Sequence, residues 1–171
     1  MARPDSSEYA PYYANYLVHV PEDDIVAAMK SGTASTLAYL AGIPESEAMI
    51  CHPPYTWTIK QVIGHLTDCE RVFGYRALRI ARGDSTPLPG FDENMYAQAA
   101  LHDRVPMSGL LSGLENLRRS HIAFFEQLPE EAWLRRGTAN NTAVSVRAIA
   151  FILLAHERHH LAIIRKRLAV G

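Results

Sequence analysis

Residues 145–168 read SVRAIAFILLAHERHHLAIIRKRL, and this stretch carries the strongest structural signal of the chain. Ser145 is a typical N-cap residue, and apolar positions follow it at intervals of three and four. This face consists of Val146, Ile149, Leu153, His156, His160, Ile163 and Arg167. The spacing predicts a long helix in a bundle. Histidine occupies two consecutive places on that face, where leucine or isoleucine is expected.

The pair His156 and His160 indicates a metal site. Residues four apart on a helix stack on one face, about 6 Å apart, which suits two imidazoles that bind one ion. A single histidine on a buried face is more often a core residue with a hydrogen-bond partner. Two in succession favour metal binding, and because two ligands bind weakly we expect a third.

The third ligand should come from another helix. Residues 58–82, with Thr58 as N-cap, repeat apolar positions at the same spacing, and His65 lies at the edge of that face. His121 lies on the face of a helix expected at 108–127, where it could instead pack or form a hydrogen bond. Periodicity favours His65. The other histidines are expected in solvent near turns or at the rim: His19, His52, His102 and His159.

The letters His156-Glu157-Arg158-His159-His160 also match the zinc-protease motif H-E-x-x-H. Zincins need a further ligand downstream. The metzincin pattern would place Gly and His at the positions of Ile163 and Lys166, and no Asp or Glu follows Glu157. We therefore interpret the match as accidental. Glu157 remains a candidate catalytic acid or base at the rim, or else a solvated helix glutamate.

The remaining periodicity completes an all-α four-helix bundle, with helices expected at about 24–40, 58–82, 108–127 and 145–168. Ser108 is the expected cap of the third. A long crossover, 84–106, joins the second and third helices and holds a short helix at 92–101. Asp92 there either lines a pocket mouth as a catalytic candidate or caps that helix. We expect a loop at 137–142 and no strand.

One domain is expected over residues 1–171, with an N-terminal arm at 1–20 and a bundle core at about 21–168. Four tyrosines in the arm suggest that it packs on the bundle or on a partner subunit. They are Tyr9, Tyr12, Tyr13 and Tyr16. Trp57 and Tyr55 are expected to anchor the loop before the second helix. Cys69 is expected to be a small core residue, although it could lie near a metal.

Composition narrows the function classes. The formal net charge is −1 with no basic face, which argues against nucleic-acid binding. Two cysteines, Cys51 and Cys69, cannot build a disulfide framework. The start of the chain is polar, unlike a signal peptide, and the longest apolar run, 148–155, is too short for a bilayer. We expect a cytoplasmic protein that does not contact membranes.

The chain resembles the DinB/YfiT-like superfamily of four-helix metal proteins. The resemblance covers nearly the whole chain and rests on the order and spacing of several landmarks. These are the run from Trp57 to Leu66, Glu70-Arg71, Tyr75-Arg76, Pro89-Gly90-Phe91-Asp92-Glu93-Asn94, and the run from His156 to Leu161. It implies an up-down-down-up bundle, often dimeric, and a divalent metal held by His65, His156 and His160.

The resemblance also implies a choice of activities. Family members are similar to S-transferases that use bacillithiol or mycothiol, to a thiol-dependent maleylpyruvate isomerase, and to metal-dependent hydrolases. We therefore expect an enzyme acting on a small molecule, with a divalent ion (zinc or nickel first, then iron or manganese) and, for transfer, a low-molecular-weight thiol. The alternatives are a non-catalytic, metal-stabilised binding protein of the same fold and a plain bundle with core histidines. A homodimer is expected.

Overall fold

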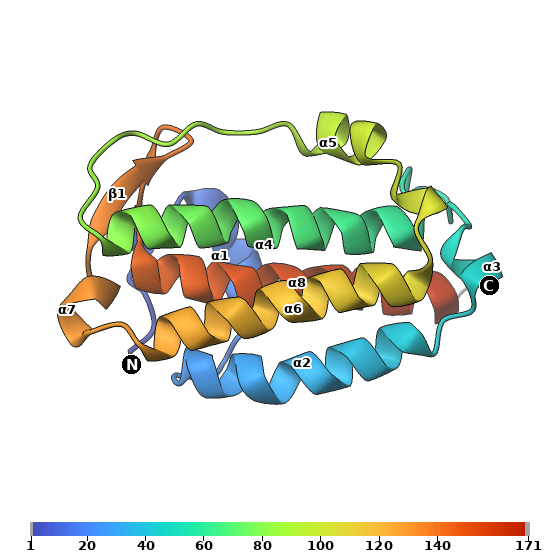
Figure 1. Cartoon of the computed structure of the whole chain (residues 1–171), viewed down its shortest axis with the longest axis horizontal. Coiled ribbons are helices and arrows are strands. Elements are labelled where there is room, and N and C mark those ends of the chain that lie inside the picture. The colour runs from blue at the N-terminus through green and yellow to red at the C-terminus, as the bar shows by residue number, and fades with distance from the viewer. Residues whose placement is uncertain (1, 170–171) are drawn as a thin grey trace.

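The computed structural model describes residues 2–169, and a bundle of four long helices dominates them (Figure 1). These are α2 (Ile25–Ala41), α4 (Ile59–Ala81), α6 (Met107–Glu126) and α8 (Val146–Ala169). Helices α2 and α4 each pack against both α6 and α8. The predicted all-α four-helix bundle is confirmed. No helix within the described residues combines the length and the apolar character needed to cross a membrane.

Short elements connect and cover the long helices. At the N-terminus lie η1 (Ser6–Glu8), η2 (Pro11–Tyr13) and α1 (Ala14–Leu17). The connections contain α3 (Glu45–Ala48), α5 (Glu93–Ala100), η3 (His102–Arg104), α7 (Glu130–Trp133), β1 (Arg136–Ala139) and β2 (Thr142–Ser145).

The direction of the helices explains the long crossover. Figure 1 shows α2 and α8 running one way and α4 and α6 the other, which is the expected up-down-down-up order. Because the neighbours α4 and α6 are parallel, the chain between them must travel back along the bundle, about 30 Å for a 20-residue helix. Residues 82–106 make this return, with α5 and η3 on the way.

Local sequence sets where the helices begin. Thr58 and Gln61 form a capping box at the start of α4, and the Ser145 hydroxyl accepts from the Ala148 amide at 3.0 Å at the start of α8. Both predicted caps are confirmed. Ser108 is not the cap of α6, because Pro106 holds the N-cap position and the Glu45 carboxylate accepts from the Met107 amide at 2.6 Å.

The buried apolar residues form two separate clusters, and every long helix contributes to both. On α8 one cluster ends at Ala155 and the other begins at Leu161; on α4 the division falls between Leu66 and Cys69. Buried polar residues fill the level between the clusters: Thr36, His65, Glu70, Arg118 and Glu157. The bundle therefore has a polar layer across its middle, and the histidines belong to that level.

The expectation of a loop at 137–142 without strands is wrong. Strands β1 and β2 pair antiparallel, with Arg136 opposite Ser145 and Ala139 opposite Thr142. Asn140 and Asn141 form the two-residue turn at φ of 49° and 60°, a left-handed conformation that asparagine tolerates and that tight hairpins require. Leu88 of the crossover exchanges backbone hydrogen bonds of 2.9 Å with Thr138 and Asn140, so the hairpin holds the crossover in place.

The N-terminal arm packs on the bundle, as one of the two expectations stated. Helix α1 contacts α8, and the Tyr13 ring lies edge-on to Phe73 at 6.2 Å between centroids. The buried Glu8 carboxylate accepts from Arg147 Nε and from the Ser145 hydroxyl, each at 2.7 Å. This contact ties the arm to the start of α8.

Candidate metal centre

Three histidine side chains from two helices meet at the polar layer. His156 Nε2 lies 3.1 Å from His65 Nε2 and 3.0 Å from His160 Nε2. The two α8 residues are one turn apart, and the packing of α4 on α8 brings His65 to them. The structure therefore brings together the three residues that the sequence proposed as ligands.

These imidazoles are neutral near pH 7. Burial is the main cause that lowers the pKa of all three. The pKa of His65 is lowered, that of His156 lies well below its usual value, and that of His160 falls to about 3. A neutral Nε2 carries either one proton or one lone pair, so His156 Nε2 cannot form good hydrogen bonds with both neighbours at once. Neutral imidazole nitrogens gathered in this way are a donor set that suits a divalent ion.

Cys69 adds a fourth potential ligand. Its Sγ lies 3.6 Å from His65 Nε2, and the ligand atoms of His65, Cys69 and His156 all lie within 4.8 Å of one another. Burial raises the pKa of the Cys69 thiol to about 12, so without a bound cation the thiol stays protonated. Cys69 is both a small core residue and a neighbour of the histidines, the two roles that the sequence left open.

The histidines line a cavity of about 370 Å³. Aromatic side chains form much of the wall: Tyr12, Tyr13, Tyr16, Trp57, Phe73 and Phe91. Polar side chains also line it, among them Arg76, Glu93 and Asn140. A concave wall that combines aromatic side chains with a few polar groups is typical of sites for small molecules. Trp57, expected only to anchor a loop, lines this cavity and lies 5.0 Å from His65 between ring centroids.

Of the two expectations for Asp92, the helix cap is confirmed and the place at the pocket is wrong. Its carboxylate caps α5, where it accepts from the amides of Asn94 and Met95 at 2.9 and 3.0 Å, and it is not among the cavity residues. Its neighbour Glu93 lines the cavity instead, and the charge of Glu93 acts to raise the pKa of His65 against the effect of burial. The acidic residue that lines the cavity is therefore Glu93, one position after the predicted Asp92.

Both expectations for Glu157 are also corrected, since it lies neither at the cavity rim nor in solvent. It is 3% exposed, accepts from the Thr36 hydroxyl at 2.8 Å and pairs with Arg118 Nη2 at 2.9 Å. Successive helical residues point about 100° apart, so Glu157 faces the bundle interior where its neighbour His156 faces the cavity.

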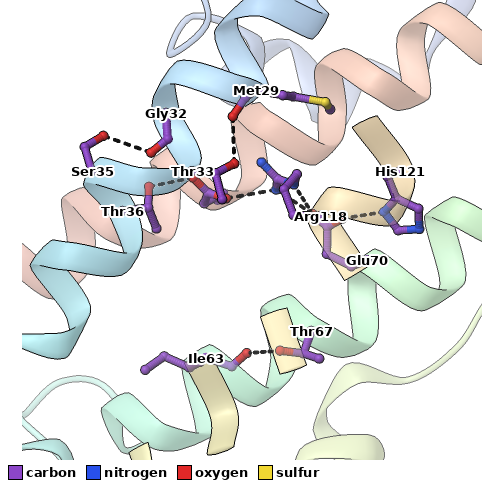
Figure 2. A network of polar contacts seen from close by, with 11 residues as sticks. Met29, Gly32, Thr33, Ser35, Thr36, Ile63, Thr67, Glu70, Arg118 and His121 are labelled. Carbon is purple, nitrogen blue, oxygen red and sulfur yellow. Dashed lines mark hydrogen bonds and ion pairs between the residues drawn. The ribbon is translucent and has the colours of Figure 1, made fainter. Parts of the chain in front are cut away.

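Arg118 joins two buried carboxylates. Besides Glu157 it binds Glu70, with Nε 3.0 Å from the Glu70 Oε1 atom. The second oxygen of Glu70 lies 2.6 Å from His121 Nδ1, and Figure 2 shows Glu70 between Arg118 and His121. His121 is thus a partner of Glu70, and it lies outside the histidine cluster.

The histidines expected in solvent are half-buried instead. His102 packs against Gly64 with Nε2 3.5 Å from Asp68, and His52 Nε2 lies 2.9 Å from Glu47. His159 lies edge-on to Tyr16 at 4.5 Å between ring centroids, which agrees with its expected place at the rim.

Fold and site together define a helical-bundle protein with a histidine cluster beside a small-molecule cavity. The chain belongs to the DinB superfamily, whose family model matches residues 28–164. It is 28% identical over 112 residues to a protein of Oceanobacillus iheyensis whose name describes it as a candidate metal-dependent hydrolase. That match covers 64% of this chain and 64% of the relative, which is less than two thirds of the relative's length.

Two solved structures share the fold. YfiT from Bacillus subtilis, described as a probable metal-dependent hydrolase with an unusual four-helix bundle topology, aligns with a TM-score of 0.71 at 16% identity and covers 96% of this chain and 90% of its own. The mycothiol-dependent maleylpyruvate isomerase aligns with a TM-score of 0.70 at 16% identity. That alignment covers 85% of this chain and 61% of the isomerase. At this identity the likeness establishes the fold.

Proposed function

We propose that this chain is a metal-dependent enzyme that acts on a small molecule, with His65, His156 and His160 as the metal ligands. The observation that carries the proposal is the meeting of three neutral imidazoles at the wall of a cavity. The printed names of the Oceanobacillus relative and of YfiT, which both describe metal-dependent hydrolases, support it.

Hydrolysis is the first candidate reaction, in line with the printed names of the Oceanobacillus relative and of YfiT. Ligand sites usually measure about 300–1,000 Å³, and about 370 Å³ leaves room for one small substrate and a water. A divalent ion held by the imidazoles would supply a water of lowered pKa and polarise the bond under attack.

The chain's own residues suit that reaction. Glu93 lines the cavity and can accept a proton there. The hydroxyls of Tyr12 and Tyr16 hydrogen-bond to one another, and burial together with that bond raises the pKa of Tyr16, so its phenol stays protonated. The mutual bond uses one of the two O–H protons, and the other can be donated to a developing negative charge. The aromatic side chains of the wall offer an apolar surface against which the body of a substrate can pack.

A thiol-dependent reaction is the second candidate. It is supported by the fold shared with a mycothiol-dependent isomerase. In that case the thiol cofactor must enter the cavity beside the electrophile, and activity should require added thiol.

Metal content tests the ligand set. Protein purified without chelators should contain close to one divalent ion per chain by elemental analysis, which also identifies the metal. His65→Ala and His156→Ala should lose it. His159→Ala is the matched control, because it removes an adjacent imidazole that does not line the cavity. Wild-type protein that stays metal-free after purification and after loading would contradict the proposal.

Cobalt substitution tests whether His160 or Cys69 is the third ligand. A thiolate bound to Co²⁺ gives charge-transfer absorption in the near ultraviolet. We expect the cobalt protein to lack that band, Cys69→Ser to retain the metal and His160→Ala to lose it. A band that disappears in Cys69→Ser would assign the position to the thiol.

Turnover tests the reaction class. Nitrophenyl ester and amide substrates should be hydrolysed by the metal-loaded protein without thiol, and His65→Ala should abolish this activity. Turnover of electrophiles only with bacillithiol, mycothiol or cysteine would favour the second candidate. A metal-loaded protein that binds ligands but turns over none of these would instead be the binding protein of the same fold.

A further inference from the structure

Arg76 is a buried cation in the cavity without an acidic partner. It is 5% exposed, and its guanidinium forms one hydrogen bond among the described residues, from Nη2 to the Pro89 carbonyl at 2.7 Å. No carboxylate of residues 2–169 lies within ion-pair distance of it. Arg118, which is also buried, has two. Because burial of an unpaired charge is unfavourable, this arrangement calls for an anion.

The surroundings of Arg76 fix its orientation and leave donors free. Its guanidinium lies 5.2 Å from the Phe73 ring centroid and 5.9 Å from that of Phe91, within cation–π range of both. Among the described residues, the side-chain nitrogens that are both inaccessible to solvent and without a hydrogen-bond partner belong to His102, Arg118 and Arg167, and none belongs to Arg76. The remaining Arg76 nitrogens are therefore still reached by solvent, and Arg76 lines the cavity.

Arg76 and the histidines mark separate ends of one wall. His65, Cys69, Phe73 and Arg76 follow one another along α4 at steps of four, four and three, and all four line the cavity. At 1.5 Å per residue the Cα atoms of His65 and Arg76 lie about 16 Å apart. Phe73 and Phe91 lie near the arginine end, and Trp57 lies beside His65 at the other.

We propose that Arg76 binds a carboxylate of the substrate, so that the enzyme acts on small carboxylic acids with an apolar, preferably aromatic, body. A guanidinium offers two parallel N–H donors that match the two oxygens of a carboxylate. The apolar body then lies against the aromatic wall, and the reactive bond lies toward the histidines. The placement of the reactive bond toward the histidines rests on the proposed function, whereas carboxylate binding by Arg76 does not.

Calorimetric titration tests this with 3-phenylpropanoate and its neutral amide, 3-phenylpropanamide, on metal-loaded and on metal-free protein. Wild-type protein should bind the carboxylate at least tenfold more tightly than the amide in both forms. Arg76→Gln should weaken carboxylate binding about 10- to 100-fold and leave amide binding within about twofold. Arg76→Lys should retain part of the preference.

Arg71→Gln is the matched control, because it removes an exposed positive charge from the same helix at a residue that does not line the cavity, and it should bind like wild type. Circular dichroism and thermal unfolding show whether the Arg76 variants are folded; the comparison of the two ligands on wild type needs no variant. Equal binding of carboxylate and amide by wild type would overturn the inference, as would full carboxylate binding by folded Arg76→Gln.

The two proposals fail separately. A carboxylate preference that depends on Arg76 in a protein without metal or turnover would uphold the anion site and reject the enzyme. Metal-dependent hydrolysis of neutral esters, combined with a carboxylate affinity that requires the metal and ignores Arg76, would reject the anion site alone.

Discussion

At the residue scale, the proposed metal ligands and the buried charges share the same stretches of helix. Glu157 follows His156 on α8, and Glu70 follows Cys69 on α4. Arg118 binds both carboxylates from α6. This contact fixes the rotation of α4 and α8 about their axes, and that rotation directs His65 and His156 toward each other. A buried ion pair is weak support for stability but well suited to such positioning.

Removal of the central charge should therefore be costly. Arg118→Met leaves two carboxylates buried without their cation, and we expect it to lower the free energy of unfolding by about 3–5 kcal/mol. Urea titration of the metal-free protein measures the effect. Arg119→Met, the next residue on α6, breaks only an exposed pair with Glu115 and should change stability by less than about 0.5 kcal/mol. Equal stability of the two variants would contradict this role for Arg118.

At the element scale, α4 and α6 approach closely at Gly74. A Cβ there would lie 2.0 Å from His121 Nε2, and the bond between His121 and Glu70 restrains that ring from moving away. Gly74→Ala should destabilise by about 1–3 kcal/mol. Gly113→Ala, on the facing helix, meets only Thr67 at 3.9 Å and should gain up to about 1 kcal/mol from helix propensity. Thermal unfolding of both variants checks the opposite signs.

The contact between the N-terminal arm and α8 should depend on pH. Burial alone would raise the pKa of Glu8, but hydrogen bonds from Arg147 and Ser145 outweigh it and lower the pKa to about 2, against 4.5 for the free side chain. The folded state thus binds fewer protons, so the stabilisation is complete above pH 4.5 and is lost as the pH falls toward 2.

Glu8→Gln measures this contribution. The variant should be less stable than wild type by about 1.5–3 kcal/mol at pH 6, and the difference should shrink between pH 4.5 and 3. Glu131→Gln, at an exposed position, should show no such difference. A gap between Glu8→Gln and wild type that stays constant from pH 6 to pH 3 would exclude the titration of Glu8 as its source.

Sequence was informative where local chemistry decides structure. Periodicity located the four long helices, and Thr58 and Ser145 cap two of them as predicted. The apolar face of α4 also indicated His65 as the histidine that meets His156 and His160. Sequence was uninformative where the partner is distant. The burial of Glu157 depends on Arg118 of another helix, and the strands of the hairpin are four residues long, too short for a clear alternation. The pair Asn140-Asn141 was the available signal for that turn.

At the scale of the whole molecule, the proposed metal ligands join α4 to α8, so an ion bound only by the folded state should stabilise the whole bundle. At a free metal concentration 100 times the dissociation constant, the gain is about 2.7 kcal/mol. A chelator should therefore lower the melting temperature of wild type, and added metal should restore it. His65→Ala should melt at one temperature with or without chelator. A wild-type melting temperature insensitive to both additions would contradict the site.

The cavity draws its walls from two kinds of segment. The histidines and Arg76 lie on α4 and α8. The other wall residues include Tyr12 on the N-terminal arm, Glu93 on the crossover and Asn140 at the turn of the hairpin. The buried faces of the helices leave little freedom for change, because their side chains pack against neighbouring helices. In the course of evolution, gene copies could therefore diverge in substrate preference by replacing only the covering segments, with the proposed metal ligands inherited unchanged. Chimaeras that exchange residues 82–106 between relatives offer a laboratory version of that history.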